Sequence, residues 1–315
     1  MKERKKELKG IYLVLIATFF WGFLGISSRI LHNGGISVTA ITFFRCFLSV
    51  IGIVVWSALY NRSAFKISKR GLLAALFYGI VGFIGCFFFY NFAVSRIPVS
   101  VVTVLLFTGT VWVILFDALL FKEPITPKKI VVMVVTIVGC ILVANLLNSK
   151  VRLDLIGIIA GLITGVCFCL QLVIPKYFEK KYKKDSLIIY GYIFASIFIG
   201  LFTDFGDTFK VLSNSNNIWP LVFNILSIGF LSTFISNTFY VKSTEYISAS
   251  LASILAAMEP VLSSIFAWIL LGEVMNLAQI IGAFLVILAA LILETDFEAM
   301  KNKIFNKENA RGGLA

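Results

Sequence analysis

One carboxylate lies far from both ends of an apolar stretch, where a negative charge is difficult to maintain. Glu259 is near the middle of the apolar run 247–271 and is followed by Pro260. An ionised carboxylate at the centre of a membrane-spanning helix costs about 3 kcal/mol, so it should be paired, protonated or in contact with water. Pro260 also frees a backbone carbonyl one turn earlier. The pair predicts either a group that binds a proton or a substrate amine, or a carboxyl group that holds a kink.

A guanidinium group and a second carboxylate also fall within apolar runs. Arg45 lies about eight residues into the run 37–60, which corresponds to about 12 Å of helical rise. Its charge has three interpretations: it reaches outward to the membrane surface, it binds an anionic group, or it pairs with Glu259. Asp117, near Lys122, is interpreted more simply as an interfacial carboxylate.

Amides and one indole complete the polar groups of these runs. An amide that faces lipid stays unsatisfied, so it should face another helix or a cavity. Each amide is therefore expected to bond between helices or to contact a solute; the four amides belong to Asn91, Gln171, Asn224 and Asn237. Trp21 is placed either to pack within the protein or to stack on an apolar or cationic solute.

The chain lacks the common motifs of catalysis and of nucleotide hydrolysis. It has no phosphate-binding GxxxxGK[ST] loop, no HExxH and no GxSxG, so we expect neither an ATP-driven pump nor an enzyme. The single histidine, His32, is followed by a polar Asn-Gly turn. No CxxC pair occurs among the cysteines, which indicates no zinc site and no disulfide framework. We expect no cofactor and no metal.

The elements that position these residues are long apolar segments. The 315 residues are 59% hydrophobic and 14% charged, against about a quarter charged in soluble domains. Continuous runs of about twenty apolar residues satisfy their backbone in lipid as helices. The sequence therefore predicts an all-α membrane protein with ten transmembrane helices, at residues 10–31, 37–60, 71–92, 98–121, 128–147, 154–175, 186–203, 218–240, 247–271 and 277–294.

The basic residues predict the orientation of these helices. With the N-terminus inside, the inner segments carry 22 Lys and Arg residues and the outer segments five, as the positive-inside rule requires. The first apolar run lacks a convincing cleavage site, so we expect a retained span and not a signal peptide. The net charge of +12 lies in short loops, which argues against nucleic-acid binding. We expect a multi-pass protein of a bacterial plasma membrane with both termini cytoplasmic.

The chain also contains an internal duplication. Residues Tyr90 to Glu123 align without a gap on Tyr240 to Glu273, and the opening spans align more weakly at a spacing of 147. Five spans per half is an odd number, so the second half should be inverted relative to the first. We therefore divide the chain into a basic N-terminus, two inverted five-helix repeats and a cytoplasmic tail, at residues 1–9, 10–147, 154–294 and 295–315.

Several short motifs resemble one known family. They include ATFFWG at 17–22, Phe44-Arg45, Tyr90-Asn-Phe-Ala, Phe121-Lys-Glu and the run from Glu259-Pro-Val to Leu-Leu-Gly-Glu273. In this order and repetition they resemble the drug/metabolite transporter superfamily, specifically its ten-span EamA-like members. Two positions depart from strict symmetry, because Thr110 corresponds to Pro260 and Phe168 to Trp21. The resemblance implies export or exchange of small polar or amphipathic metabolites, often amino acids or toxic compounds.

These observations predict a secondary transporter that works by alternating access. Its solute should bind near the membrane midplane between the repeats, mainly against the first, third, fourth, sixth, eighth and ninth spans. The predicted contacts are Trp21, Arg45, Asn91, Gln171, Asn237 and Glu259, and Glu259 is also the candidate for proton coupling. The expected partners are a small-molecule substrate, the lipid bilayer and protons, with the protein a monomer or homodimer. A non-transporting membrane scaffold or lipid-handling subunit is the alternative.

Overall fold

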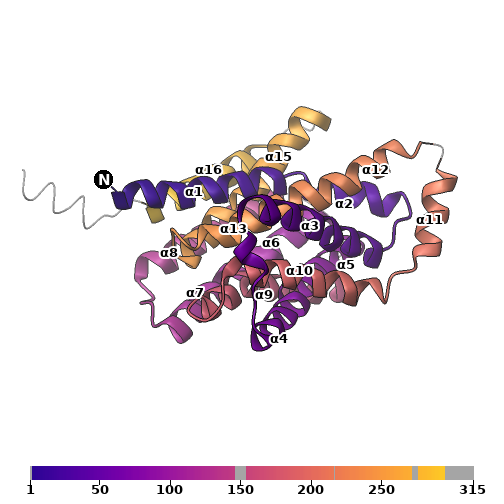
Figure 1. The fold of residues 1–315 in the computed structure, drawn as a ribbon. Coiled ribbons are helices and arrows are strands. Elements are labelled where there is room, and N and C mark those ends of the chain that lie inside the picture. Colours follow the sequence, from indigo (N-terminus) through magenta and orange to yellow (C-terminus); the bar gives the residue numbers. More distant parts are fainter. Residues whose placement is uncertain (1, 146–153, 216, 272–275, 295–315) are drawn as a thin grey trace, which may run out of the picture.

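The computed structural model describes residues 2–145, 154–215, 217–271 and 276–294. The predicted C-terminal tail at 295–315, the boundary between the repeats at 148–153 and the loop residue Glu273 lie outside these residues. Within the described ranges the secondary structure is helical throughout, with no strand. The all-α fold class predicted from the sequence is confirmed (Figure 1).

The helices follow the predicted apolar segments closely. Those before residue 146 are α1 (Lys2–Trp21), α2 (Leu24–Asn33), α3 (Val38–Tyr60), η1 (Arg62–Phe65), α4 (Lys69–Phe77), η2 (Tyr78–Ile84), α5 (Gly85–Val94), α6 (Val99–Phe107), α7 (Gly109–Phe121) and α8 (Pro127–Val143). Those after residue 153 are α9 (Leu155–Phe178), α10 (Lys184–Gly200), α11 (Phe205–Asn214), α12 (Trp219–Leu226), η3 (Ser227–Ile235), α13 (Ser236–Ser243), α14 (Ala249–Ala256), α15 (Met258–Leu271) and α16 (Leu277–Glu294).

Seven helical stretches of the described chain are long and apolar enough to cross a membrane. They are Lys5–Asn33, Val38–Tyr60, Lys69–Val94, Val101–Phe121, Leu155–Phe178, Trp219–Ser243 and Ala249–Phe266. An eighth results if α10 and α11, which meet at 84°, form one broken span. The helices α8 and α16 cover the two remaining predicted segments and are shorter in their apolar parts.

Irregularities of the helices recur at equivalent places in the two halves. The π-helices η2 and η3 lie at residues 78–84 and 227–235, which nearly coincide when the sequence is shifted by 150. Single-residue breaks separate α6 from α7 at Thr108 and α14 from α15 at Ala257. A π-turn inside an α-helix is frequent at functional sites. The repeated positions show that the duplication seen in the sequence extends to local backbone geometry.

The contacts between helices are reciprocal between the halves. The helix α1 packs against α13 and α14, and its counterpart α9 packs against α5 and α6. In the same way α3 packs against η3, and α10 packs against η2. The final helices of the halves, α8 and α16, pack on one another. Each of these contacts between a helix of the first half and one of the second therefore has an equivalent in which the roles of the two halves are exchanged.

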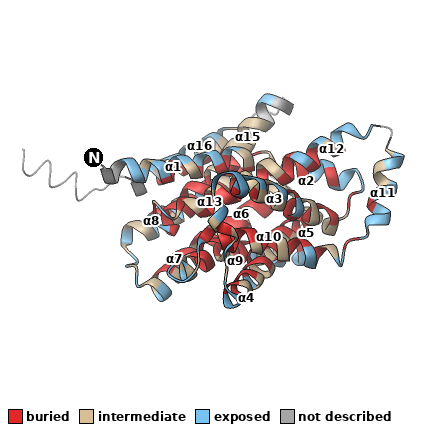
Figure 2. Cartoon of the chain, in the orientation of Figure 1, coloured by how far each residue is buried: buried red, intermediate tan, exposed pale blue. Residues whose placement is uncertain are grey.

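The bundle has two distinct ends, which lie at the left and right of Figure 1. The N-terminal end includes the start of α1 and the turns near Asp185 and Tyr246, joined by bonds from Lys9 to Tyr246 (2.8 Å) and from Asn61 to Asp185 (2.7 Å). The opposite end includes α11 and an ion pair between Arg96 and Asp154 (2.8 Å). Buried residues run through the centre between these ends, and exposed residues lie on the outer faces (Figure 2).

The contact between α8 and α16 depends on two glycines. A Cβ atom on Gly282 would come within 2.6 Å of the Val143 nitrogen and 2.7 Å of the Gly139 carbonyl oxygen. A Cβ on Gly139 would similarly approach the Gly282 oxygen at 3.0 Å. Small residues of this kind allow helix backbones to approach closely in membranes.

We predict that Gly282→Ala destabilises the folded protein by about 1–3 kcal/mol, because the new methyl group meets backbone atoms that cannot rotate away. The measurement is the thermal unfolding midpoint of the purified protein in detergent. The control is Gly206→Ala in α11, where a Cβ would meet only the Asp204 side chain at 3.3 Å. Equal midpoints for the two variants would contradict the close packing of α8 and α16.

Candidate functional site

A small cavity lies where the two halves meet. Its volume is about 20 Å³, room for about one water molecule. Helices of both halves line it, through Trp21, Leu24, Arg45, Cys86, Phe87, Tyr90, Leu106, Phe168, Asn237 and Glu259. These residues come from α1 to α3, α5, α6, α9, α13 and α15. We call this set the central cavity.

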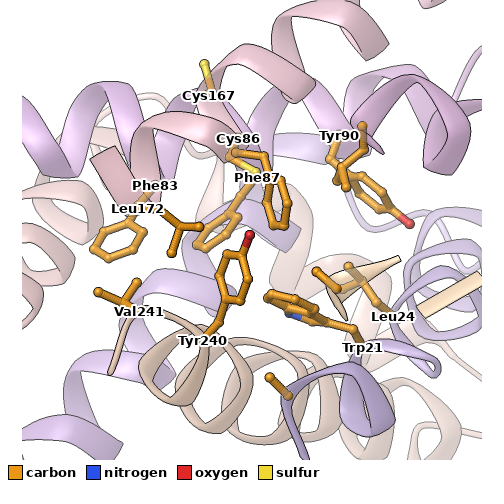
Figure 3. Close-up of a cluster of buried hydrophobic side chains, with 14 of the residues drawn as sticks. Trp21, Leu24, Phe83, Cys86, Phe87, Tyr90, Cys167, Leu172, Tyr240 and Val241 are labelled. Carbon is orange, nitrogen blue, oxygen red and sulfur yellow. The ribbon is translucent and has the colours of Figure 1, made fainter. Parts of the chain in front are cut away.

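An aromatic cluster that includes Trp21 and Phe168 of the lining adjoins the central cavity, and Figure 3 shows two of its members, Trp21 and Tyr240, side by side. Trp21 meets Tyr240 edge to face with ring centroids 5.0 Å apart, and Phe168 stacks on Tyr240 at 5.1 Å. Trp21 and Phe168 also contact one another at 5.7 Å. Since Phe168 is the counterpart of Trp21 in the second half, the two halves contribute equivalent positions to the same wall.

Arg45 is enclosed within the bundle, with only 2% of its surface exposed. Its Nε donates a hydrogen bond to Thr233 Oγ1 at 3.0 Å, and its guanidinium carbon lies 4.0 Å from the centroid of the Phe87 ring. Nη1 is buried and has no hydrogen-bond partner among the described residues. The interpretation in which Arg45 reaches the membrane surface is therefore wrong, and its charge is directed into the protein.

Glu259 is also buried, with 4% of its surface exposed, and it lines the same cavity. It is the second residue of α15, directly after the break at Ala257. The hydrogen bonds and ion pairs of the described chain include none for its carboxyl group, and none joins it to Arg45. The structure therefore shows neither the predicted pair with Arg45 nor a carboxyl group bonded to the neighbouring backbone.

Of the four predicted amides, Asn224 donates to the carbonyl oxygen of Pro220 in its own helix (2.7 Å), and the three that were expected to contact a solute divide between two kinds of environment. Asn237 lines the central cavity, and its Nδ2 has no partner within the described part of the chain. Asn91 donates to the carbonyl oxygen of Phe87 in its own helix (2.8 Å), and Gln171 donates to that of Gly82 in η2 (3.1 Å). Asn91 and Gln171 do not line the cavity. Contact of Asn91 or Gln171 with a solute therefore stays a prediction. The hydrogen bonds that the structure shows join each of these amides to the protein backbone.

Sequence reasoning did not single out most of the apolar lining. Phe87, Tyr90, Leu106 and Phe168 belong to the cavity, but phenylalanine and leucine are too frequent in this chain to be distinctive. One signal was available, because Phe168 and Trp21 occupy equivalent positions of the duplication. If both residues of an equivalent pair are assumed to lie at the interface of the halves, the choice of Trp21 as a site residue also predicts Phe168.

A cluster of charges joins the two halves at the N-terminal end. The carboxylate of Asp117 (1% exposed) accepts from Lys176 Nζ at 2.9 Å and from Ser250 Oγ at 2.7 Å. Lys176 also bonds Glu123 at 2.7 Å, and Glu123 lies 3.5 Å from Lys129. We call these five residues the ion cluster. The partner of Asp117, which the sequence analysis interpreted as an interfacial carboxylate, is thus Lys176 on α9.

The ion cluster also sets the charge of Glu123, which lies in the connection after α7. Partial burial raises the pKa of Glu123, but the hydrogen bond and positive charge of Lys176 outweigh this and lower the pKa below its ordinary value. Glu123 therefore remains a carboxylate at neutral pH, as a stable contact with Lys176 requires.

Two open pockets lie at the ends of the bundle, each of about 600 Å³. At the opposite end the pocket is lined by His32, Ser37, Val38, Thr39, Phe88, Phe92, Ser95 and Arg96. At the N-terminal end it is lined by Glu179, Tyr182, Lys183, Lys184, Asp185, Thr244 and Glu245. Neither pocket shares a lining residue with the central cavity.

Comparison with known proteins decides the family. The family model of the EamA-like transporter family matches twice, over residues 8–145 and 155–295. The chain belongs to this family. The resemblance predicted from the motifs is confirmed, and the two matches fall on the two halves.

The relatives of this EamA-like chain are transporters by name. An uncharacterized transporter of Clostridium kluyveri is 26% identical, over 90% of this chain and 92% of that protein. A pseudopaline exporter, CntI, of Pseudomonas aeruginosa is 21% identical over 90% and 95%. An S-adenosylmethionine uptake transporter of Rickettsia bellii is 22% identical over 84% and 86%. These names indicate a membrane transporter rather than an enzyme.

A solved crystal structure shows the same fold. It superimposes with a TM-score of 0.68 at 15% sequence identity, covering 90% of this chain and 96% of that one. At this identity the likeness concerns the fold alone, so the chemistry of the central cavity must be argued from the residues of this chain.

We predict that Lys176→Gln destabilises the protein by about 2 kcal/mol, because it leaves the Asp117 carboxylate buried with Ser250 as its remaining hydrogen-bond partner among the described residues. This is below the cost of breaking a fully buried pair, since Lys176 keeps some contact with solvent. Thermal unfolding in detergent measures the change, with the exposed Lys180→Gln as the control. If Lys176→Gln and Asp117→Asn were additive in the double variant, the ion pair would carry no coupling energy.

Proposed function

We propose that the protein is a secondary transporter that carries a small solute across the membrane by alternating access. The observation that supports this most directly is the central cavity, in which Arg45, Asn237 and Glu259 meet at the interface of the two halves. Solute sites of repeat-built transporters lie at such interfaces, near the bilayer midplane. Arg45 and Glu259 are costly in an apolar bundle, and a solute contact accounts for their presence.

We further propose ten spans in two inverted repeats, at residues 10–147 and 154–294. In this arrangement α8 and α16 serve as the fifth span of each half. The reciprocal contacts of α1 with α13 and of α9 with α5 fit a two-fold relation between the halves. An odd number of spans in each half makes this relation an inversion.

The charge distribution supports the orientation of this arrangement. The connections of the N-terminal end are rich in lysine, including the stretch from Lys180 to Lys184. By the positive-inside rule this end faces the cytoplasm. We propose a bacterial plasma membrane and two cytoplasmic termini, the C-terminal one lying outside the described residues.

The ion cluster is proposed as the cytoplasmic gate. It links α7 and its following loop in the first half to Lys176 and Ser250 in the second. Opening a path from the central cavity to the cytoplasm requires these bonds to separate while the halves rock apart. The breaks at Thr108 and Ala257 interrupt the helices α6–α7 and α14–α15 beside the cavity, where a change of backbone angle is least costly.

Glu259 is the proposed site of proton coupling. A buried carboxylate without a fixed partner can exchange a proton when the cavity opens to water. A proton that enters from outside would then be exchanged for a solute molecule that leaves the cell. If no proton is coupled to transport, the solute gradient alone would drive exchange. We propose export or exchange as the direction. The named relatives include both an exporter and an uptake transporter.

The proposed transport function predicts that cells with and without the protein differ in the concentrations of one or a few metabolites. Untargeted mass spectrometry of medium and cytoplasm should show one or a few solutes enriched outside expressing cells by several-fold. Cells that make the Glu259→Gln variant at equal membrane abundance should lack this enrichment. A scaffold or lipid-handling subunit would produce no such difference, and full activity of Glu259→Gln would remove that residue from the mechanism.

Transport measurements in proteoliposomes separate proton coupling from solute binding. For a solute found in this screen, an imposed pH gradient should accelerate transport by the native protein and leave exchange by Glu259→Gln unchanged. The control Lys180→Gln should respond to the gradient as the native protein does, because Lys180 is exposed and distant from the cavity. A gradient response retained in Glu259→Gln would place the proton site elsewhere.

The inverted topology predicts that equivalent loops face opposite sides of the membrane. A cysteine introduced by Glu123→Cys should react with an impermeant maleimide only from the cytoplasmic side, and one introduced by Glu273→Cys only from outside. Labelling of whole cells and of inverted vesicles measures this. Reaction of both from the same side would exclude the inverted arrangement.

A further inference from the structure

The helix α11 turns away from the direction of the bundle. Its axis meets that of α10 at 84°, and it runs across the opposite end of the bundle between α10 and α12 (Figure 1). The 17 residues of α10 rise about 26 Å, which is close to the thickness of the hydrocarbon core, about 30 Å. With α10 as a membrane span, α11 therefore lies near the membrane surface and roughly parallel to it.

One face of α11 is fixed to the protein. The carboxylate of Asp204 accepts a hydrogen bond from the backbone nitrogen of Asp207 at 2.9 Å and so begins the helix. Thr208 is buried. Val211 lies over the turn between α2 and α3, where a Cβ atom on Gly35 would come within 3.4 Å of it. These contacts determine which of the other side chains of α11 point away from the bundle.

A second face of α11 is apolar and largely exposed. Phe205 and Phe209 are four residues apart, so they project on the same side of the helix. The Phe205 ring meets that of Phe43 on α3 edge to face, with centroids 4.9 Å apart, and Phe205 still has 47% of its surface exposed. Phe209 is 72% exposed. Exposure of two phenylalanines to water forgoes the favourable burial of their rings, which indicates a partner outside the chain.

The third face of α11 is polar. Asp207, Lys210 and Asn214 are exposed. At about 100° per residue, all three lie about 100–160° around the helix from Phe209. A helix with an apolar face and an opposed polar face is the form that lies in a membrane interface, with one face among the acyl chains and the other in water.

Exposed apolar residues continue on both sides of α11. Leu201 and Phe202 directly precede it and are 78% and 64% exposed. The Phe202 ring lies 5.3 Å from that of Phe198 on α10. After α11, Trp219 and Phe223 on α12 are exposed in the same way. The apolar face of α11 thus continues the lipid-facing surface of the spans, which identifies lipid as its partner.

We infer that α11 is an interfacial helix that binds the lipid leaflet at the opposite end, with Phe205 and Phe209 among the acyl chains and Lys210 in water. From Asp204 to Asn214 the charges are two carboxylates and one lysine, so the helix lacks the basic cluster that binds anionic headgroups. Apolar burial therefore holds it in place. The inference requires only that the bundle spans a membrane, and it holds whether or not a solute is transported.

Nitroxide labels on two neighbouring residues test this placement. Phe209→Cys and Lys210→Cys are labelled separately in the full chain and reconstituted into phosphatidylcholine vesicles. Collisions with oxygen then report acyl chains, and collisions with a water-soluble nickel chelate report water. The ratio of oxygen to nickel collisions should be several-fold higher at position 209 than at position 210. Both residues are exposed, so neither substitution removes packing inside the bundle.

Two further positions calibrate the ratio. Ile51→Cys on the exposed side of α3 gives the lipid reference, and Lys180→Cys in the exposed stretch after α9 gives the water reference. The five native cysteines are buried, and the unsubstituted protein measures their residual labelling.

Three results would overturn the inference. Equal, water-like ratios at positions 209 and 210 would place α11 in solvent above the membrane. Protection of position 209 from both reagents would mean that protein covers this face, and magnetic coupling between the labels of two chains would identify a second copy. A lipid-like ratio at position 209 that appears only when phosphatidylglycerol is added would mean that headgroup charge, and not apolar burial, holds the helix.

Discussion

The feature on which the structure depends is a buried arginine and a buried glutamate that line one cavity of an apolar bundle without a bond between them. Arg45 and Glu259 line one cavity with room for about one water molecule, and no ion pair of the described chain joins them. Charges in such a setting are costly unless something neutralises them. The surrounding scaffold, with Thr233 on Nε and Phe87 on the guanidinium face, holds Arg45 in place instead of letting it reach Glu259 or the surface.

The duplicated architecture explains why the polar residues of the cavity differ between the two halves. Both halves repeat the π-helices η2 and η3 and the helix breaks at Thr108 and Ala257, although the break between α1 and α2 has no counterpart in the continuous helix α9. The side chains differ. At the spacing of 150, Asn237 corresponds to Phe87 and Glu259 to Gly109, and at the spacing of 147 the counterpart of Arg45 is Tyr192. The polar chemistry of the cavity therefore lies at positions where the two copies have diverged, and its aromatic wall lies at positions where they remain alike.

Much of the fold was predictable because membrane helices are specified by apolar length and by loop charge. The residues that line the central cavity were harder to predict. Whether Asn91 or Asn237 faces a solute depends on the rotation of its helix, which packing against other helices determines. The π-helices η2 and η3 make this harder, because an added residue shifts every following side chain around the helix. Gln171 bonds to the backbone of η2, at Gly82, and no helical periodicity would have placed that acceptor.

The small size of the central cavity links specificity to movement. At about 20 Å³ it has room for about one water molecule, so the proposed binding of a solute requires the halves to separate from the arrangement seen here. Such a separation would remove contacts such as the packing of Trp21 and Phe168 on Tyr240, and at the N-terminal end it would strain the ion cluster. A ligand shifts a conformational equilibrium only by the difference in its affinity for the two states. In the proposed mechanism, a solute that contacts Arg45 or Glu259 would bind only after the cavity has expanded, so binding and opening of the halves would be coupled.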